Sequence, residues 1–251
     1  MAVDLAVLTR YLDELLEPER FADYAPNGLQ VQGRSEVRRI VTAVSANQAA
    51  IDAAVAAEAD VLLTHHGFFW RNEPRTIVGP HATRLAALLG HGLSLIAYHL
   101  PLDAHPVVGN NVGFLRALGA APARPFAGEP PIGWLGDLPA AIDVDEALTR
   151  IATAAGAPPL AFAHGPGRVR RVAMVSGGGA GFFEEGVAGG ADLFVTGEAS
   201  EMAQALAREL GATFVAAGHH RTERHGPRAL GEHVAGRFAV EVTFHDVDNP
   251  V

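Results

Sequence analysis

Three groups of histidines and carboxylates stand out in the sequence as possible metal ligands. They are the adjacent pair His65 and His66, and two pairs separated by four positions, His99 with Asp103 and His219 with Glu223. Imidazole nitrogens and carboxylate oxygens together suit zinc, iron, manganese or cobalt better than calcium or magnesium. The 251 residues include no cysteine, so a metal in this protein must be bound through nitrogen and oxygen.

Two adjacent imidazoles in one pocket indicate a pair of metal ions rather than a single ion. Two-metal sites hold their ions about 3.5–4 Å apart, with a carboxylate or water between them, and Glu223 suits that bridging position. Successive side chains on a strand point to opposite faces. His65 and His66 can therefore serve one centre only where the chain turns, as Gly67 permits. Each histidine taken singly is at least as compatible with a structural role.

An internal repeat places these residues in matching positions. Val37–Gly67 aligns without gaps on Val169–Ala199, at an offset of 132 residues. Each copy runs from an apolar β-branched stretch, through a turn and an alanine-rich helix, to a second apolar stretch, which is a βαβ pattern. The segments that end at Asp103 and Glu223 match at an offset of 120. The ungapped alignment argues against chance similarity.

The fold class follows from apolar strands that alternate with helices. This pattern predicts an α/β protein with mostly parallel sheets covered on both faces, arranged as two similar βαβαβ-type domains related by internal duplication. A helix is expected near Val3–Leu16, with an apolar stripe of Leu5, Leu8, Leu12 and Leu15. The Pro-, Gly- and Ala-rich residues 121–131 resemble a linker, followed by a strand in IGWLGDLP and a helix in VDEALTRIATAAG.

These elements divide the chain near residue 125. The first half, residues 1–125, carries His65, His66 and Asp103, and the second, residues 126–251, carries His219 and Glu223. A C-terminal strand in the second half is available to pack on the first.

Further polar residues stand at the ends of the predicted strands, where ligands gather in open α/β sheets. Glu198 is a candidate general base, or a carboxylate that favours the first turn of the next helix. His99 is a candidate catalytic group, a ligand, or a residue that orients Asp103 from behind. His220 and Arg221 are candidates for supporting a ligand or contacting substrate.

Composition excludes several classes of protein. The formal charge of -9 argues against a nucleic-acid binder, which normally shows a basic patch. Asp4 and Asp13 interrupt what would be a signal's apolar region, and no apolar run is long enough to span a bilayer, so we expect a cytoplasmic protein without membrane partners. SGGGAGF has Phe182 where a dinucleotide fingerprint needs glycine and lacks the lysine of a P-loop, which favours a tight turn. NGLQVQG, residues 27–33, is interpreted as a polar turn without assigned chemistry.

Taken together, these residues resemble the Nif-three-like dinuclear metal-centre hexameric proteins, the GTP cyclohydrolase I type-two homologues, in their short bacterial form. The resemblance spans nearly the whole chain through NGLQVQG, THHGFFW, YHLPLDAHPVVGNN, WLGDLP, SGGGAGF, TGEASE, AAGHHRTERHGPRAL and TFHDVDNP. It implies a Nif-three-like fold with a dimetal centre in the cleft between two α/β domains, and a toroidal homohexamer. The ligands that it implies for two divalent ions per chain are His65, His66, Asp103, His219 and Glu223.

The family's name implies hydrolytic opening of the guanine ring of GTP. We therefore expect a metal-dependent hydrolase that acts on a nucleotide or another phosphorylated heterocycle. The alternative is a non-catalytic metal-binding, metal-delivery or regulatory hexameric assembly. A purely structural site would be coordinatively closed, whereas a hydrolase needs an open coordination position.

Overall fold

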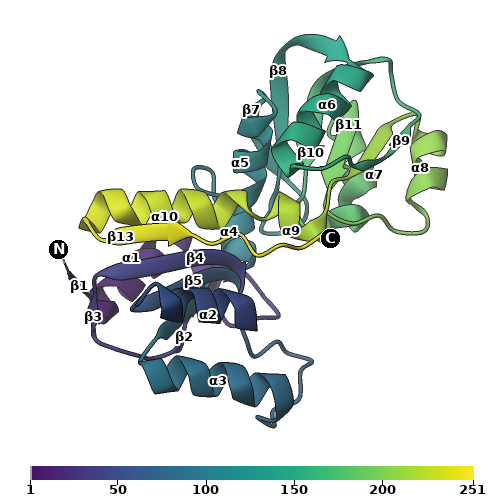
Figure 1. Ribbon diagram of the computed structural model, residues 1–251. Helices are drawn as coiled ribbons and strands as arrows, with labels where there is room; N and C mark the ends of the chain where they lie inside the picture. The colour runs from purple at the N-terminus through teal and green to yellow at the C-terminus, as the bar shows by residue number, and fades with distance from the viewer. Residues whose placement is uncertain (1) are drawn as a thin grey trace. The chain divides into compact units, whose positions relative to one another are not determined.

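The computed structural model, shown in Figure 1, describes residues 2–251 and contains two compact units. The first unit consists of residues 2–102 and 227–248, and the second consists of residues 103–226 and 249–251. The chain therefore passes from one unit to the other after Leu102, after Gly226 and after Asp248. This division differs from the single boundary near residue 125 that composition suggested.

The first unit is built on a five-stranded sheet in the order β13-β4-β5-β6-β2. Its strands are β13 (Glu241–Phe244), β4 (Arg39–Ser45), β5 (Val61–His66), β6 (Ser94–Ala97) and β2 (Gly28–Val31). The first four run parallel to their neighbours and β2 is antiparallel to β6. The short strands β1 (Val3–Asp4) and β3 (Glu36–Val37) pair with each other.

The opening helix of the first unit forms where the leucine spacing predicts it. Helix α1 spans Leu5–Leu16, and the Asp4 side chain caps it by accepting hydrogen bonds from two backbone N–H groups of the first turn. Its buried leucines include Leu16, while Leu15 is only half-buried. The remaining helical segments are η1 (Pro18–Arg20), α2 (Gln48–Ala56) and α3 (Gly79–His91). The chain passes between the units within α4 (Leu100–Ala104) and within α10 (His225–Phe238), most of which belongs to the first unit.

The second unit is built on a six-stranded sheet in the order β7-β8-β10-β11-β12-β9. Its strands are β7 (Ala121–Phe126), β8 (Gly133–Asp143), β10 (Arg168–Met174), β11 (Leu193–Thr196), β12 (Thr213–Ala216) and β9 (Leu160–Ala163). Strands β10, β11 and β12 are parallel, and the other three are antiparallel to their neighbours. The helical segments are α5 (Asn110–Ala117), α6 (Val144–Ala155), η2 (Gly179–Phe182), α7 (Phe183–Ala188), α8 (Ala203–Leu210) and α9 (His219–Thr222).

The stretch that composition suggested as a linker contains a strand. Residues Ala121–Phe126 form β7, which lies at the edge of the sheet and pairs with β8. Pro122 and Pro125 have no N–H to donate, and an edge strand tolerates this because one of its sides has no partner strand. Similarly, Gly28–Val31 in the polar NGLQVQG segment forms β2. The predicted strand and helix that follow the supposed linker are observed as β8 and α6.

The two units share a structural device that coincides with the internal repeat. In each unit one aspartate accepts hydrogen bonds, at 2.8–3.0 Å, from two consecutive arginine N–H groups at the start of the first parallel strand. The residues are Asp60 with Arg38 and Arg39, and Asp192 with Arg170 and Arg171, all separated by 132 positions. The third parallel strand of each unit in chain order also has an antiparallel neighbour: β6 pairs with β2, and β12 pairs with β9. A duplicated architecture fits these common features.

Each repeat is followed by a helix and a strand that belong to the other unit. Helix α5 follows the first repeat but packs against β7, β8 and β10 of the second unit. Most of α10 follows the second repeat but packs in the first unit, where a Cβ atom at Gly231 would lie within 3.0 Å of Val242 on β13 and Thr42 on β4. This exchange is why the unit boundary does not fall near residue 125. None of the helices within residues 2–251 has both the length and the apolar character needed to cross a membrane.

Candidate metal centre

Three imidazoles gather at the carboxyl ends of β5 and β6 in the first unit. His65 and His66 end β5, and His99 follows β6. One nitrogen from each ring lies within 4.8 Å of the other two, and the His65 and His66 rings are 4.5 Å apart. His65 is fully buried and His99 is 7% exposed. Parallel neighbouring strands end at the same edge of a sheet, so the topology brings these residues together.

Gly67 allows this cluster to form by its small size. A Cβ atom at this position would lie 2.3 Å from the Gln30 side-chain oxygen. Gln30 uses that oxygen to accept a hydrogen bond of 2.6 Å from the Phe68 N–H, which fixes the chain directly after the two histidines. The glycine therefore permits a close approach of neighbouring groups.

Hydrogen bonds define which nitrogen of each imidazole is available for a metal. His65 Nδ1 lies 3.1 Å from the Tyr98 carbonyl oxygen, and His99 Nδ1 lies 2.9 Å from Asp23 Oδ1. Both partners accept, so we assign the ring protons to Nδ1. Neutral rings then carry their lone pairs on Nε2, the usual arrangement of a metal-binding histidine supported from behind. His66 Nδ1 is 3.0 Å from Ser45 Oγ.

The Asp23 carboxylate is held ionised behind His99. Burial alone would raise the pKa of Asp23, but the hydrogen bond from His99 and the attraction of that ring's charge when it is protonated outweigh it. With further hydrogen bonds from Asn27 and the Leu100 N–H, they lower the pKa of Asp23 to about 2. The carboxylate is therefore charged near neutral pH and holds the His99 ring in one orientation.

The NGLQVQG segment supports this histidine cluster. Asn27 accepts a hydrogen bond of 2.7 Å from the His99 N–H and donates one of 3.1 Å to Asp23. Gln30 holds Phe68 as described above. Sequence reasoning assigned these residues no chemistry, because their partners lie far along the chain and no local pattern reveals them.

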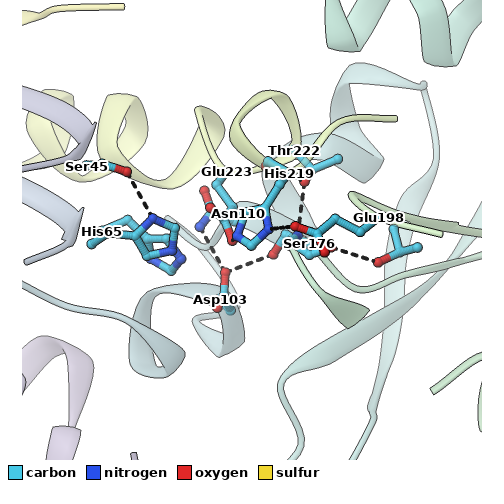
Figure 2. A network of polar contacts seen from close by, with 12 residues as sticks. Ser45, His65, Asp103, Asn110, Ser176, Glu198, His219, Thr222 and Glu223 are labelled. Atoms are coloured by element: carbon cyan, nitrogen blue, oxygen red, sulfur yellow. Dashed lines mark hydrogen bonds and ion pairs between the residues drawn. The ribbon is translucent and has the colours of Figure 1, made fainter. Parts of the chain in front are cut away.

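A second cluster, in the second unit, is dominated by carboxylates (Figure 2). His219 begins α9 and Glu223 follows it, with His219 Nε2 3.1 Å from Glu223 Oε1. A carboxylate oxygen of Asp103 lies within 4.8 Å of one from Glu223. Both carboxylates are buried, with Asp103 6% and Glu223 2% exposed. Two buried carboxylates this close repel each other, and a bound cation would offset that repulsion.

Asp103 is oriented by a network of buried polar side chains. Ser176 Oγ donates to Asp103 Oδ1 at 2.8 Å, and Asn110 Nδ2 donates to the same oxygen at 2.9 Å (Figure 2). Asn111 donates to the Asp103 carbonyl at 3.2 Å and accepts from the Ser176 N–H at 2.7 Å. Both asparagines are fully buried. The sequence motif that contains them was noticed, but this supporting role was not predicted.

Glu198 lies behind His219 as Asp23 lies behind His99. Its Oε1 is 2.6 Å from His219 Nδ1, so Nδ1 donates and Nε2 faces Glu223. The hydrogen bond to Glu223 raises the pKa of His219 to about 9, against an opposing effect of burial and with further help from the charges of Glu223 and Glu198. A metal ion at Nε2 would have to replace the proton that this arrangement favours.

Glycines leave the space that the second cluster occupies. Gly177 has a φ of +60°, and a Cβ atom there would lie 2.3 Å from Glu223 Oε1 and 3.0 Å from His219 Nε2. The glycine-rich SGGGAGF segment thus provides Ser176 for Asp103 and room for Glu223, and its last four residues form η2. The room that the Glu223 and His219 side chains need, and not phosphate spacing, accounts for this glycine.

The other candidate residues lie beside these clusters. His220 is buried, and its backbone N–H donates to the Val251 carbonyl at 2.9 Å. Arg221 is half-buried and packs its side chain over Gly218.

The donor set fits a transition-metal ion. It contains imidazole nitrogens and carboxylate oxygens whose spread matches that of ligands around a common ion. At bond lengths of about 2.0–2.2 Å, two ligands on opposite sides of one ion lie roughly 4 Å apart, against the 4.8 Å limit within each group. The chain therefore contains groups of histidine, aspartate and glutamate that could hold a metal ion.

Comparisons with known proteins agree over the full length. The family model Duf34/NIF3 (NGG1p interacting factor 3) matches residues 3–250. A Pseudomonas aeruginosa protein named GTP cyclohydrolase 1 type 2 homolog is 46% identical over 252 residues, covering 100% of both chains. The solved structure of protein ybgI, of unknown function, has a TM-score of 0.95 at 41% identity, covering 99% of this chain and 100% of that one. A Thermus thermophilus structure has a TM-score of 0.91 at 37% identity, with the same coverage. By sequence and by fold, the chain belongs to the Duf34/NIF3 family.

Proposed function

We propose that this chain binds two divalent metal ions and is a metal-dependent hydrolase of a nucleotide or another phosphorylated heterocycle. One observation carries the proposal. Each unit presents a compact cluster of metal-binding side chains, and residues behind each cluster fix the orientation of its ligands. Burying ionisable groups in this way costs stability. The arrangement therefore favours a functional role for the side chains that it orients.

The proposed ligands of a single dinuclear centre are His65, His66, Asp103, His219 and Glu223, with Glu223 as the bridge. Chain connectivity supports joining the two clusters. His99 of the first cluster and Asp103 of the second are four residues apart, which even an extended chain limits to about 14 Å. Glu223 likewise lies three residues before Gly226, where the chain passes to the first unit.

Charge supports an anionic substrate for this centre. The two carboxylates would neutralise only half of the charge of two divalent ions, because the imidazoles contribute none when neutral. The loaded site would remain positive and attract a phosphorylated molecule. The name of the Pseudomonas aeruginosa relative, GTP cyclohydrolase 1 type 2 homolog, makes nucleotides the first substrates to test.

A bound metal pair would supply Lewis-acid charge that polarises the bond to be broken and acidifies a water molecule. The chain's own residues orient the ligands. Glu198 would act as a positioning residue that holds His219 through Nδ1, and Asp23 would hold His99 in the same way. A third imidazole, His99, within the first cluster is then available to contact a substrate or to hold a proton.

Elemental analysis of anaerobically purified protein tests this proposal. We expect about two transition-metal ions per chain, lost in a His65→Ala, Glu223→Ala double variant. A His91→Ala, Glu14→Ala variant, which changes the same residue types at exposed positions, should keep them. Absence of metal even after reconstitution would refute the centre. Full metal loading without turnover of any nucleotide or other phosphorylated heterocycle would refute the hydrolase and favour a metal-delivery or regulatory role.

A ring-shaped homohexamer is part of the proposal through the family resemblance. Light scattering of the metal-loaded protein at micromolar concentration should give about six times the mass of the chain. A stable monomer under those conditions would contradict it.

A further inference from the structure

A pocket lies directly beyond the two histidines that end β5. It has a volume of about 330 Å³ and is lined entirely by residues of the first unit between Gly67 and Arg84. Its polar and aromatic lining comes from Phe68, Trp70, Glu73, Thr76, His81 and Arg84. This volume is at the lower end of the range for small-molecule sites. No role in the proposed metal centre accounts for this lining.

Two basic side chains of the pocket have buried nitrogens that need a partner. Within residues 2–251, neither Arg84 Nε nor His81 Nε2 has a hydrogen-bond partner, although both atoms are buried. Arg84 also forms no ion pair with any described carboxylate. A buried polar group without a hydrogen bond costs about 1–3 kcal/mol, and native proteins rarely leave such groups unmatched. An anionic group in the pocket would accept hydrogen bonds from the Arg84 guanidinium, and from His81 Nε2 when that nitrogen carries the ring proton.

The start of helix α3 adds positive potential at the same place. The helix has thirteen residues, its first turn has no side-chain cap, and Val78, Pro80 and His81 line the pocket. The free N–H groups and the dipole of a helix N-terminus favour a negative charge nearby. Arg84, His81 and the helix N-terminus therefore all select for an anion.

An aromatic wall connects the pocket with the histidine cluster. Trp70 lines the pocket, and its ring lies 5.6 Å from that of His66 and 5.1 Å from that of His99. Tyr24 lies 5.7 Å from Trp70. A planar ring placed against Trp70 would gain stacking contacts. It would also lie next to the side chains that we assign to the metal centre.

We propose that this pocket binds an aromatic or heteroaromatic ring that carries an anionic group, and that it is the substrate-recognition pocket. The anion lies by Arg84, His81 and the start of α3, and the ring lies against Trp70. The assignment as substrate pocket rests on the proposed hydrolase function. The assignment as a binding pocket does not, because every residue that forms it belongs to the first unit.

Isothermal titration calorimetry with small probes tests the pocket on both metal-loaded and metal-free protein. The probes are phenyl phosphate, benzoate, inorganic phosphate and phenol. We expect phenyl phosphate to bind to both forms, and phosphate and phenol to bind at least tenfold more weakly. Binding of benzoate equal to that of phenyl phosphate would identify a carboxylate pocket, which supports the anion site while removing the preference for phosphate. Binding that disappears with the metal would overturn the proposal, because the ions would then be the anion site.

Variants separate the pocket from its surroundings. Arg84→Gln and Trp70→Ala should each weaken phenyl phosphate at least tenfold, while Arg75→Gln, an exposed arginine of the same segment, should bind as the unchanged protein does. Equal binding by Arg84→Gln would overturn the proposal. If Arg84→Gln fails to fold, Glu73→Gln serves instead. Removing this exposed negative charge from the lining should tighten the binding of phenyl phosphate, and weaker binding would contradict the proposed anion site.

The outcomes for the pocket and for the hydrolase can be told apart. A pocket that binds phenyl phosphate in a protein without hydrolytic turnover would leave the ligand site standing and refute the enzyme. A protein that hydrolyses nucleotides while Arg84→Gln and Trp70→Ala leave KM unchanged would keep the enzyme and refute the assignment of this pocket to substrate recognition.

Discussion

The two clusters occupy matching places in the repeats but contain different chemistry. The first unit has His65 and His66 at the end of β5, and the repeat places Gly197 and Glu198 at the corresponding positions of the second unit. A Cβ atom at Gly197 would lie 2.6 Å from the His219 Cα, so no histidine fits there. Glu198 instead bonds to His219 from behind.

The same contrast appears one strand earlier. Ser45 at the end of β4 contacts His66, whereas its counterpart 132 positions later is Gly177, which leaves room for Glu223. The duplicated scaffold is thus common to both units, while the residues at the strand ends are specialised. One cluster offers neutral, directional imidazole nitrogens, and the other offers negative charge. The proposed pair of divalent ions would draw on both kinds of ligand.

Removing charge from the second cluster should have the largest effect on metal binding. Glu223→Gln keeps the shape of the side chain but removes a buried charge, and we expect affinity for the metal to fall more than about 100-fold, beyond the usual cost of losing a supporting residue. Competition with a chelator measures this loss. His66→Gln, which removes a neutral ligand, should cost less. The reverse order would contradict the division of roles between the clusters.

The pH dependence of metal binding should report the second cluster. The pKa of His219 is raised from 6.5 to about 9 in the metal-free chain. Protonation of His219 therefore stabilises the folded metal-free chain fully below pH 6.5, and this contribution is lost progressively up to pH 9. A metal replaces this proton, and its affinity should therefore rise with pH, by at most about tenfold per pH unit, over a window that ends near pH 9. Glu198→Gln should move the window to lower pH. A profile that is flat between pH 7 and 9 would show that His219 binds no metal.

Residues behind the ligands should matter less than the ligands themselves. Ser176→Ala removes one of two hydrogen bonds to Asp103 Oδ1, and a loss of about 10-fold to 100-fold in metal affinity is expected. Ser45→Ala is the matched change in the first unit, where the serine contacts His66. We expect a smaller loss there, because an imidazole needs less help than a charged carboxylate to keep its position. A greater loss with Ser45→Ala would reverse the comparison.

The shared scaffold should respond equally in both units. Asp60→Asn and Asp192→Asn each weaken two hydrogen bonds from backbone N–H groups to a charged oxygen. Each substitution should lower the free energy of unfolding by about 1.5–3 kcal/mol, measured by urea denaturation of the metal-free protein. Effects that differ severalfold would show that the repeated hydrogen bonds do not carry equal weight.

The sequence was most informative where periodicity and residue type coincide. The α/β fold and the family are confirmed, and α1 and α6 form where their patterns indicate. The five-ligand set stays a prediction, although His65 with His66, and Asp103 with Glu223, do come together within their own units. Composition misled at residues 121–126, because prolines mark edge strands as well as linkers.

The supporting residues had no signal in the sequence. Asn27 meets His99 across 72 residues of chain, and Asn111 meets Ser176 across 65. Such partners are chosen by the three-dimensional arrangement of strands, and local patterns of polarity do not encode them. Asp23, which meets His99 across 76 residues, was missed for the same reason, whereas Asn110 lies only seven residues from Asp103.

The exchange of terminal segments has a consequence for synthesis on the ribosome. Strand β13 pairs with β4 through Glu241 and Arg39, so this edge of the first sheet stays uncovered until residues 241–244 have been made. An uncovered edge strand invites pairing with other chains, and such distant contacts form slowly. The nascent first unit would therefore keep an uncovered sheet edge until residues 227–248 arrive. A fragment that stops near residue 125 would remain aggregation-prone, however well its own helices form.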